Sequence, residues 1–198
     1  SSSGSASAVA SGQSALAMGT DTGGSVRIPS SFCGLVGLKP TFGLVSRHGV
    51  GTLAPTMDHC GPLTRTVMDC ALALNVISGY DEKDRSSSKS HVQDFTNTIK
   101  NGVKGIRIGV PKQFFEVPIE PEVEESVLKS IRILEGMGAI ISGISLPSFH
   151  QIVEIGSKLL SAEAATIHKN LFQKDGIRLP KDVHCRFCLL YTSPSPRD

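Results

Sequence analysis

The stretch MGTDTGGSVRIPSSFCGLVGLKP, residues 18–40, places a single serine, Ser25, directly after two glycines. Glycine adopts backbone angles that other residues avoid and lets another molecule approach the main chain closely. A serine hydroxyl attacks a carbonyl group only when a base removes its proton and N–H groups stabilise the resulting oxyanion. The consecutive backbone N–H groups of Thr22, Gly23, Gly24 and Ser25 suit that second task. Ser25 is therefore a candidate nucleophile, and the alternative is a tight turn whose serine caps the next segment.

Length, composition and charge describe one ordinary globular domain. Of the 198 residues, 39% are hydrophobic and 19% are charged, with a net charge of +2, which is typical of a folded chain with a sizeable core. This charge predicts neither nucleic-acid binding nor attraction to a membrane surface. No apolar run reaches the roughly 18 residues that cross a bilayer. The five cysteines are odd in number and scattered. They favour a reducing compartment, so we expect a cytoplasmic protein without a disulfide framework.

Strand and helix patterns alternate along the chain, which predicts an α/β fold with a mixed, twisted β-sheet covered by helices on both faces. Strands are expected at residues 15–22, 32–41, 105–111 and 139–147, and helices at 5–14, 64–79, 120–139 and 149–172. Two of these helices have apolar faces, made of Val67, Cys70, Ala71, Leu74 and Ile77 and of Val123, Val127, Ile131 and Leu134. The polar residues 80–105 are expected to form a surface connection.

Other catalytic machinery fits the chain poorly. Ser25 lacks the second glycine of a G-x-S-x-G elbow, because Arg27 stands in its place. No Gly-Lys-Ser/Thr follows the glycines, which excludes a phosphate loop. Residues 21–23 spell the DTG of aspartic proteases, but the chain has one copy and the dyad needs two carboxylates. The histidines carry no triad signature, and His48 and His59 are expected in a loop.

The last residues, 188–198 (CLLYTSPSPRD), differ abruptly in composition and read like a sequencing adapter translated in frame. We therefore expect residues 1–187 to be one incomplete domain. His184, Cys185 and Cys188 have the spacing of a zinc or redox site, but they lack a second ligand pair, and Cys188 belongs to the excluded stretch. We expect no metal.

Three linked motifs resemble those of the amidase signature family. SSSGSASAVASG (residues 1–12), GTDTGGSVRIP (19–29) and FCGLVGLKPT (32–41) occur in the order and at the spacing of that family. Linked motifs are stronger evidence than a single glycine loop, and the resemblance continues to about residue 172. It implies the α/β fold of the family, hydrolysis of a carbon–nitrogen amide bond, and no cofactor.

The resemblance also implies a Ser–cis-Ser–Lys triad. Ser25 aligns with the nucleophile of the family, and Ser1, 24 residues earlier, aligns with the bridging serine that a cis peptide bond holds. In the family a neutral lysine takes the proton of the bridging serine, which takes that of the nucleophile, and an acyl-enzyme forms. A lysine serves as a base only when its pKa is lowered towards neutrality. Thr22, Gly23 and Gly24 would join Ser25 as oxyanion donors.

Residues beside the two serines are candidates for supporting roles. Ser2, Thr20, Asp21 and Arg27 are expected to support the serines or to face the substrate, and a structural ion pair is an equal alternative for Arg27. Cys33 is expected in the core, because buried cysteine behaves as a small hydrophobic residue.

The chain departs from the family at the catalytic base. The family's lysine precedes the bridging serine, and this sequence opens at that serine. Lys39, Lys104 and Lys112 do not match the lysine motif, so we expect them to be structural. The glycine pair that precedes the bridging serine in the family is also absent. We therefore expect these 198 residues to be inactive by themselves.

Two activities compete within the family. Ile28 and His59 stand where the A subunit of the glutamyl-tRNA(Gln)/aspartyl-tRNA(Asn) amidotransferase typically has glutamine, which favours a free-standing amidase. The spelling GLVSRHGV at residues 43–50 favours the amidotransferase instead. A non-catalytic homologue is the third alternative, and the retained Ser1 and Ser25 argue against it. We expect a small-molecule amide as substrate, no directly bound nucleic acid and no membrane. A homodimer is open, and the amidotransferase alternative would bring B and C subunits as partners.

Overall fold

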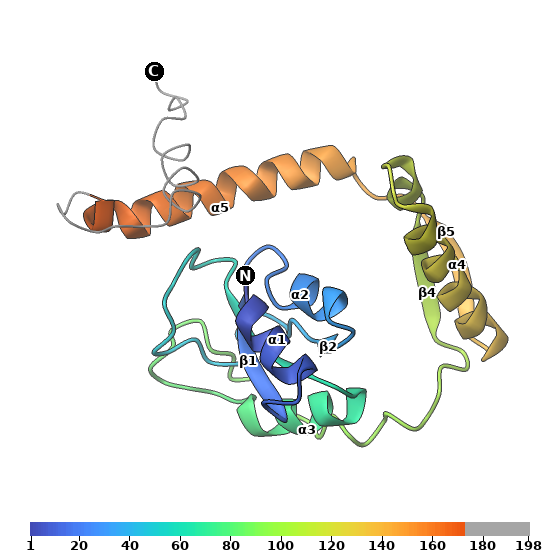
Figure 1. The fold of residues 1–198 in the computed structure, drawn as a ribbon, viewed down its shortest axis with the longest axis horizontal. Coiled ribbons are helices and arrows are strands. Elements are labelled where there is room, and N and C mark those ends of the chain that lie inside the picture. Colours follow the sequence, from blue (N-terminus) through green and yellow to red (C-terminus); the bar gives the residue numbers. More distant parts are fainter. Residues whose placement is uncertain (173–198) are drawn as a thin grey trace. The chain divides into compact units, whose positions relative to one another are not determined.

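The computed structural model of the chain describes residues 1–172 (Figure 1). The stretch 188–198 and the group of His184, Cys185 and Cys188 lie outside the described residues. The described residues divide into two compact units, one of residues 1–97 and 158–172, and one of residues 98–157. The candidate nucleophile lies in the first unit.

A three-stranded antiparallel sheet forms the centre of the first unit. Its strands are β1 (Leu16–Asp21), β2 (Val36–Gly37) and β3 (His59–Thr64), in the order β1-β3-β2. Strand β1 pairs with β3 along its whole length, from Leu16 opposite Thr64 to Asp21 opposite His59. The expected strand at 32–41 is reduced to two residues, and β3, which the sequence did not predict, is the central strand.

Helices cover both faces of this sheet. Leu63 of β3 packs with Ala6 of α1 (Ser3–Ala10) and with Val26, which precedes α2 (Arg27–Phe32). Cys60 of β3 packs with Leu74 of α3 (Val67–Ile77). Residues 60 and 63 point to opposite faces because side chains alternate along a strand. The expectation of an α/β fold with a sheet covered on both sides is therefore confirmed for this unit.

Helix α3 begins at Val67, later than the predicted start at residue 64, and Thr66 caps it by accepting a hydrogen bond from the backbone N–H of Asp69 at 3.1 Å. Cys70, Ala71 and Leu74 are buried against the sheet as expected. Val67 is 60% exposed, so its assignment to the buried face is wrong. It is the first residue of the helix, beside the exposed cap.

The second unit is a small parallel βαβ arrangement. Strand β4 (Arg107–Pro111) pairs in parallel with β5 (Ile140–Ile144), and η1 (Lys112–Glu116) and α4 (Pro121–Gly136) connect them. Val127, Ile131 and Leu134 of α4 are half-buried as expected, whereas Val123, in the first turn, is 52% exposed and was assigned wrongly.

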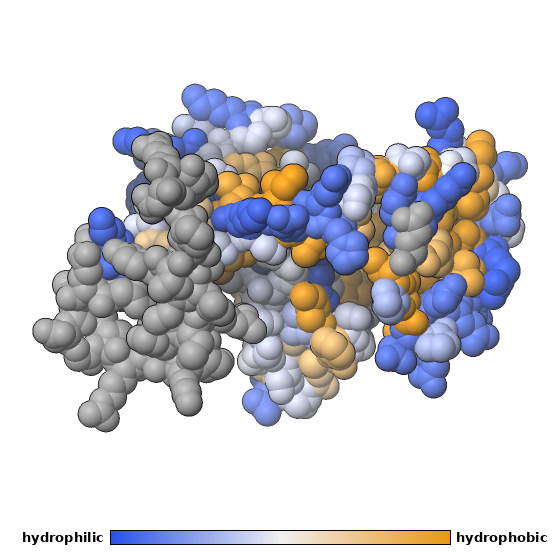
Figure 2. Space-filling model, turned by 90° about the horizontal axis from the view of Figure 1, so that it is seen from above, coloured by the Kyte–Doolittle hydropathy of each residue, from blue (hydrophilic) through white to orange (hydrophobic). Residues whose placement is uncertain are grey.

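One helix does not cover both faces of a parallel pair, and parallel sheets are usually covered on both. Large hydrophobic side chains of this unit are exposed, among them Ile106, Ile133, Met137 and Ile140. Figure 2 shows hydrophobic residues on the surface in orange. Helix α5 (Phe149–Phe172) starts in this unit, and its residues from 158 on belong to the first.

Residues 80–105 contain neither helix nor strand, which confirms the expected surface connection. Within residues 1–172, no helix is both long and apolar enough to cross a membrane.

Candidate active site

Ser25 lies in the turn that joins β1 to α2 and is half-buried. The glycine before it is required by the backbone: Gly24 has a φ of +122°, where L side chains are strained. A Cβ atom at Gly24 would also lie 2.6 Å from the Cδ1 of Ile28. The turn therefore needs glycine at this position, as the sequence motif suggested.

The Asp21 side chain stabilises this turn through hydrogen bonds. Its fully buried carboxylate accepts hydrogen bonds from the backbone N–H groups of Gly24 at 2.8 Å and Val26 at 3.2 Å. It also binds the Arg27 guanidinium through Nε and Nη2, each at 3.0 Å. Burial opposes ionisation of Asp21, but the hydrogen bonds from Arg27 and the two amides outweigh it and lower the pKa of the carboxyl. Arg27 therefore forms a structural ion pair with Asp21, which is the alternative considered for it from the sequence.

The first residues of the chain lie against the same turn. The Ser2 N–H donates to the Ser25 carbonyl oxygen at 3.0 Å. The Ser2 hydroxyl accepts from the Thr20 N–H at 3.0 Å and donates to the Thr20 carbonyl oxygen at 3.2 Å. Ser1 receives a hydrogen bond from the Ser3 hydroxyl at 3.2 Å. Ser2 thereby places Ser1 beside the turn that carries Ser25.

Ser1 and Ser25 open on one cavity of about 340 Å³. Its lining residues come from the start of the chain, from β1 and the turn after it, from the loop before β3 and the start of β3, and from residues 83–85: Ser1, Thr20, Thr22, Ser25, Arg47, His48, Gly49, Val50, Gly51, Thr52, Leu53, Pro55, Asp58, His59, Cys60, Lys83, Asp84 and Arg85. Four sequence-predicted residues are therefore brought together, while Ser2, Asp21, Gly23, Gly24 and Arg27 lie outside the lining.

The backbone N–H groups of the turn are not equivalent. That of Gly24 points to the Asp21 carboxylate, so it is engaged and unsuited to hold an oxyanion. Within residues 1–172, no acceptor is assigned to the N–H groups of Gly23 and Ser25. Thr22, Gly23 and Ser25 remain the predicted oxyanion donors.

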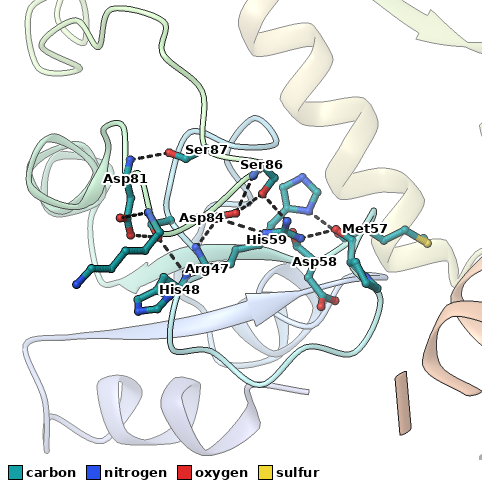
Figure 3. A network of polar contacts seen from close by, with 12 residues as sticks. Arg47, His48, Met57, Asp58, His59, Asp81, Asp84, Ser86 and Ser87 are labelled. Carbon is teal, nitrogen blue, oxygen red and sulfur yellow. Dashed lines mark hydrogen bonds and ion pairs between the residues drawn. The ribbon is translucent and has the colours of Figure 1, made fainter. Parts of the chain in front are cut away.

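Arg47, which the sequence did not single out, joins two loops of the cavity wall (Figure 3). Its backbone N–H donates to Asp84 at 2.8 Å, and Nη1 donates to the carbonyl oxygens of Pro55 at 2.5 Å and Asp58 at 3.2 Å. Nη2 donates to the Ser86 hydroxyl. Burial disfavours the charged form of Asp84, but hydrogen bonds from Ser86 and Arg47 and the Arg47 charge lower its pKa to about 2.

His59 is the first residue of β3, so its expected place in a loop is wrong. Its Nδ1 lies 2.6 Å from the Met57 carbonyl oxygen and its Nε2 lies 3.3 Å from Lys39 Nζ. The carbonyl oxygen can only accept, so Nδ1 carries the proton and Nε2 accepts from Lys39. The imidazole also meets the Phe42 ring edge to face. His59 and Lys39 thus hold each other at the cavity edge.

The cysteines within residues 1–172 do not offer a competing nucleophile. Cys33, Cys60 and Cys70 are free thiols, and Cys33 packs against the Ala6–Val26–Leu63 cluster as expected. Burial raises the pKa of Cys60 and Cys70, which disfavours the reactive thiolate. No group of three or more potential metal ligands is found within residues 1–172.

Comparisons with known proteins agree on the family. A family model described as Amidase matches residues 1–187. The A subunit of the glutamyl-tRNA(Gln) amidotransferase of Thermoanaerobacter pseudethanolicus is 48% identical over 178 residues, which cover 90% of this chain and 36% of that protein. The chain thus spans about a third of the length of this curated relative.

Solved structures show the same relationship. The A subunit of the glutamyl-tRNA(Gln) amidotransferase of Thermotoga maritima superposes with a TM-score of 0.81 at 38% identity, covering 94% of this chain and 40% of that one. The peptide amidase of Stenotrophomonas maltophilia superposes with a TM-score of 0.75 at 28% identity, covering 100% and 45%. Together with the serine-bearing turn, these matches show that the chain belongs to the amidase signature family.

Proposed function

We propose that the complete protein, meaning this chain with the remainder that its relatives carry, hydrolyses a small-molecule amide with Ser25 as nucleophile. The observation that carries the proposal is that Ser1 and Ser25 line one cavity. In the same turn, the backbone N–H groups of Gly23 and Ser25 donate to no acceptor within residues 1–172. A hydroxyl, a second hydroxyl to relay its proton, and unengaged amides are the groups that acyl transfer needs.

The reaction divides into two steps. Ser25 Oγ bonds to the amide carbonyl carbon while its proton passes to Ser1 Oγ, whose own proton passes to a lysine that the family resemblance places before Ser1. The carbon–nitrogen bond then breaks, and the amine or ammonia leaves with the returned proton. Water attacks the acyl ester, releases a carboxylate and restores Ser25. In both steps the N–H groups of Gly23 and Ser25 would stabilise the oxyanion.

Covalent labelling of the complete protein tests the assignment. A fluorophosphonate is expected to modify Ser25, and Ser25→Ala is expected to abolish both labelling and turnover with the melting temperature nearly unchanged. Ser31→Ala, an exposed serine in α2, is the matched control and should keep both. A label on another residue, or a Ser25→Ala variant with most of its turnover, would refute the proposal. A protein that neither reacts nor turns over would favour the non-catalytic alternative.

A second candidate function has a specific observation in its favour. Curated relatives at 42–48% identity are the A subunits of glutamyl-tRNA(Gln) amidotransferases. In that case the same serine chemistry would release ammonia from glutamine for a partner protein. Co-expression with the genes next to the complete gene decides between the two. Co-purification of a partner and glutamine-dependent transfer of ammonia would establish the amidotransferase, whereas turnover by the isolated protein without transfer supports the free-standing amidase.

A further inference from the structure

We infer that Asp58 is a positioning residue for the serine-bearing turn, acting through the side chain of Thr22. This inference rests on the proposed function, since it concerns the N–H groups that would hold the oxyanion. Sequence reasoning gave Asp58 no role, and Thr22 was considered only for its backbone N–H.

The contacts of Asp58 use both of its carboxylate oxygens. Oδ1 accepts the Thr22 hydroxyl at 2.6 Å. Oδ2 accepts the backbone N–H groups of Leu53 at 2.8 Å and Ala54 at 3.0 Å. The residue is 8% exposed, so these hydrogen bonds form largely away from water and are correspondingly strong. One buried carboxylate therefore ties the loop before β3 to the first residue of the turn.

The position of Thr22 makes this tie important. Thr22 lies between Asp21 and Gly23 in the sequence. Asp21 fixes the far end of the turn through the N–H groups of Gly24 and Val26. The Gly23 N–H donates to no acceptor within residues 1–172. Two consecutive glycines leave the backbone unusually free. The Thr22–Asp58 bond restrains the near end of the turn, so both ends of the glycine pair are held by carboxylates from different segments.

The same carboxylate also reaches the wall of the cavity. Leu53, Thr22 and Asp58 all line it, and the Asp58 carbonyl oxygen accepts from Arg47. A displacement of this loop is therefore transmitted to Thr22 through a single side chain. The competing explanation is that Asp58 only closes its own turn with Leu53 and Ala54, in which case the Thr22 hydroxyl would be dispensable.

Substitution of Thr22 separates the two explanations in the complete protein. Thr22→Val keeps the shape of the side chain and removes only the donor, whereas Thr22→Ser keeps the donor. We expect Thr22→Val to lower kcat by about 10- to 100-fold, because small misplacements of catalytic groups cost rates of that order. KM should change by less than about threefold, and Thr22→Ser should restore kcat to within about threefold of the wild type.

A double-mutant cycle tests the partner. Asp58→Ala should lower kcat at least as much as Thr22→Val, and the double variant should be no slower than Asp58→Ala alone, because both substitutions remove the Thr22–Asp58 hydrogen bond. Thr66 and Asp69 supply a matched control, since Thr66 Oγ1 donates to Asp69 Oδ2 at 2.7 Å at the start of α3. Thr66→Val should lower the melting temperature and leave kcat unchanged.

The outcomes separate this inference from the proposed function. If Ser25 is labelled and essential but Thr22→Val keeps wild-type kcat, the inference fails and the proposed function stands. If Thr22→Val and Asp58→Ala slow the enzyme additively, the two residues act independently and the inference also fails. If Ser25 is neither labelled nor essential, the proposed function itself fails.

Discussion

Arg27 and Asp21 form a two-point ion pair, in which Nη2 lies 3.0 Å from Oδ1 and Nε lies 3.0 Å from Oδ2. The Asp21 side chain is fully buried, whereas that of Arg27 is 51% exposed. The pair bridges the last residue of β1 and the first residue of α2, the two elements that flank the Ser25 turn. The arginine of the motif is therefore engaged within the fold, and the carboxylate holds the turn.

Asp21→Asn should destabilise the complete protein by about 2–4 kcal/mol, because a buried acceptor of charged and backbone donors is lost and several donors remain unpaired. Urea unfolding, followed by circular dichroism, measures the change. Arg27→Lys keeps a positive charge but loses the two-point geometry, so it should lower the free energy of unfolding by less than Asp21→Asn does. A variant within about 0.5 kcal/mol of the wild type would show that the carboxylate does not hold the turn.

Local patterns predicted much of the fold because they have local causes. Strand β1 is a short apolar run before a glycine turn, α3 has a threonine cap and a regular apolar face, and α4 begins at Pro121, which suits a first helical turn. Strand β3 was missed because Gly61 and Pro62 are poor strand residues. It forms because β1 and β2 pair with it on either side, which is a tertiary cause.

The candidate site divides in the same way. Ser25 and its glycines are adjacent in sequence, so one motif carries them. The Thr22–Asp58 bond joins residues 36 apart and the Arg47–Ser86 bond joins residues 39 apart. Arg47, Asp58 and Asp84 have no local signature, and only folding brings them to the cavity.

Acid should weaken the loop contacts of Asp84 in a defined pH range. The pKa of Asp84 in the folded protein is about 2, below its ordinary value of 3.8. A lowered folded-state pKa means that the unfolded chain binds the proton more readily, so stability falls as the pH drops from about 4 through 2. The urea midpoint of the wild type should therefore fall more steeply between pH 5 and pH 2.5 than that of Asp84→Asn.

A carboxyl-to-amide change in the same loop provides the control for Asp84. Glu82 is exposed, and Glu82→Gln should keep the steep wild-type dependence on pH. Equal slopes for the wild type and Asp84→Asn would contradict the pairing of Asp84 with Arg47 and Ser86.

Gly61 is required by the close approach of two backbones. A Cβ atom there would lie 2.0 Å from the Leu38 carbonyl oxygen and 3.2 Å from Pro40. Because Gly61 is in the central strand, the backbone cannot move aside without disturbing both neighbours. Gly61→Ala should cost about 2–3 kcal/mol or more, seen as a lower melting temperature. Gly136→Ala, where no atom lies within 4 Å, should be tolerated. Equal melting temperatures for the two variants would contradict the packing at Leu38.

Ser2 is expected to matter for turnover beyond its share in stability. Its hydroxyl makes two hydrogen bonds to the main chain of Thr20, and its N–H binds the Ser25 carbonyl oxygen. Ser2→Ala should leave Ser1 less firmly placed beside Ser25 and lower kcat by about tenfold, with a stability loss of about 1–2 kcal/mol. Steady-state kinetics and urea unfolding of the complete protein measure both.

Ser5 offers the matched comparison for Ser2, because its hydroxyl donates to the Met18 carbonyl oxygen of the same strand at 2.9 Å and Ser5 does not line the cavity. Ser5→Ala should lose a comparable amount of stability, about 1 kcal/mol, and keep its kcat. Both hydroxyls anchor the first residues of the chain to β1, but of the two residues only Ser2 adjoins Ser1 and binds the Ser25 carbonyl oxygen through its N–H. If the two variants show the same kcat, Ser2 contributes to the fold alone and does not place the proton relay.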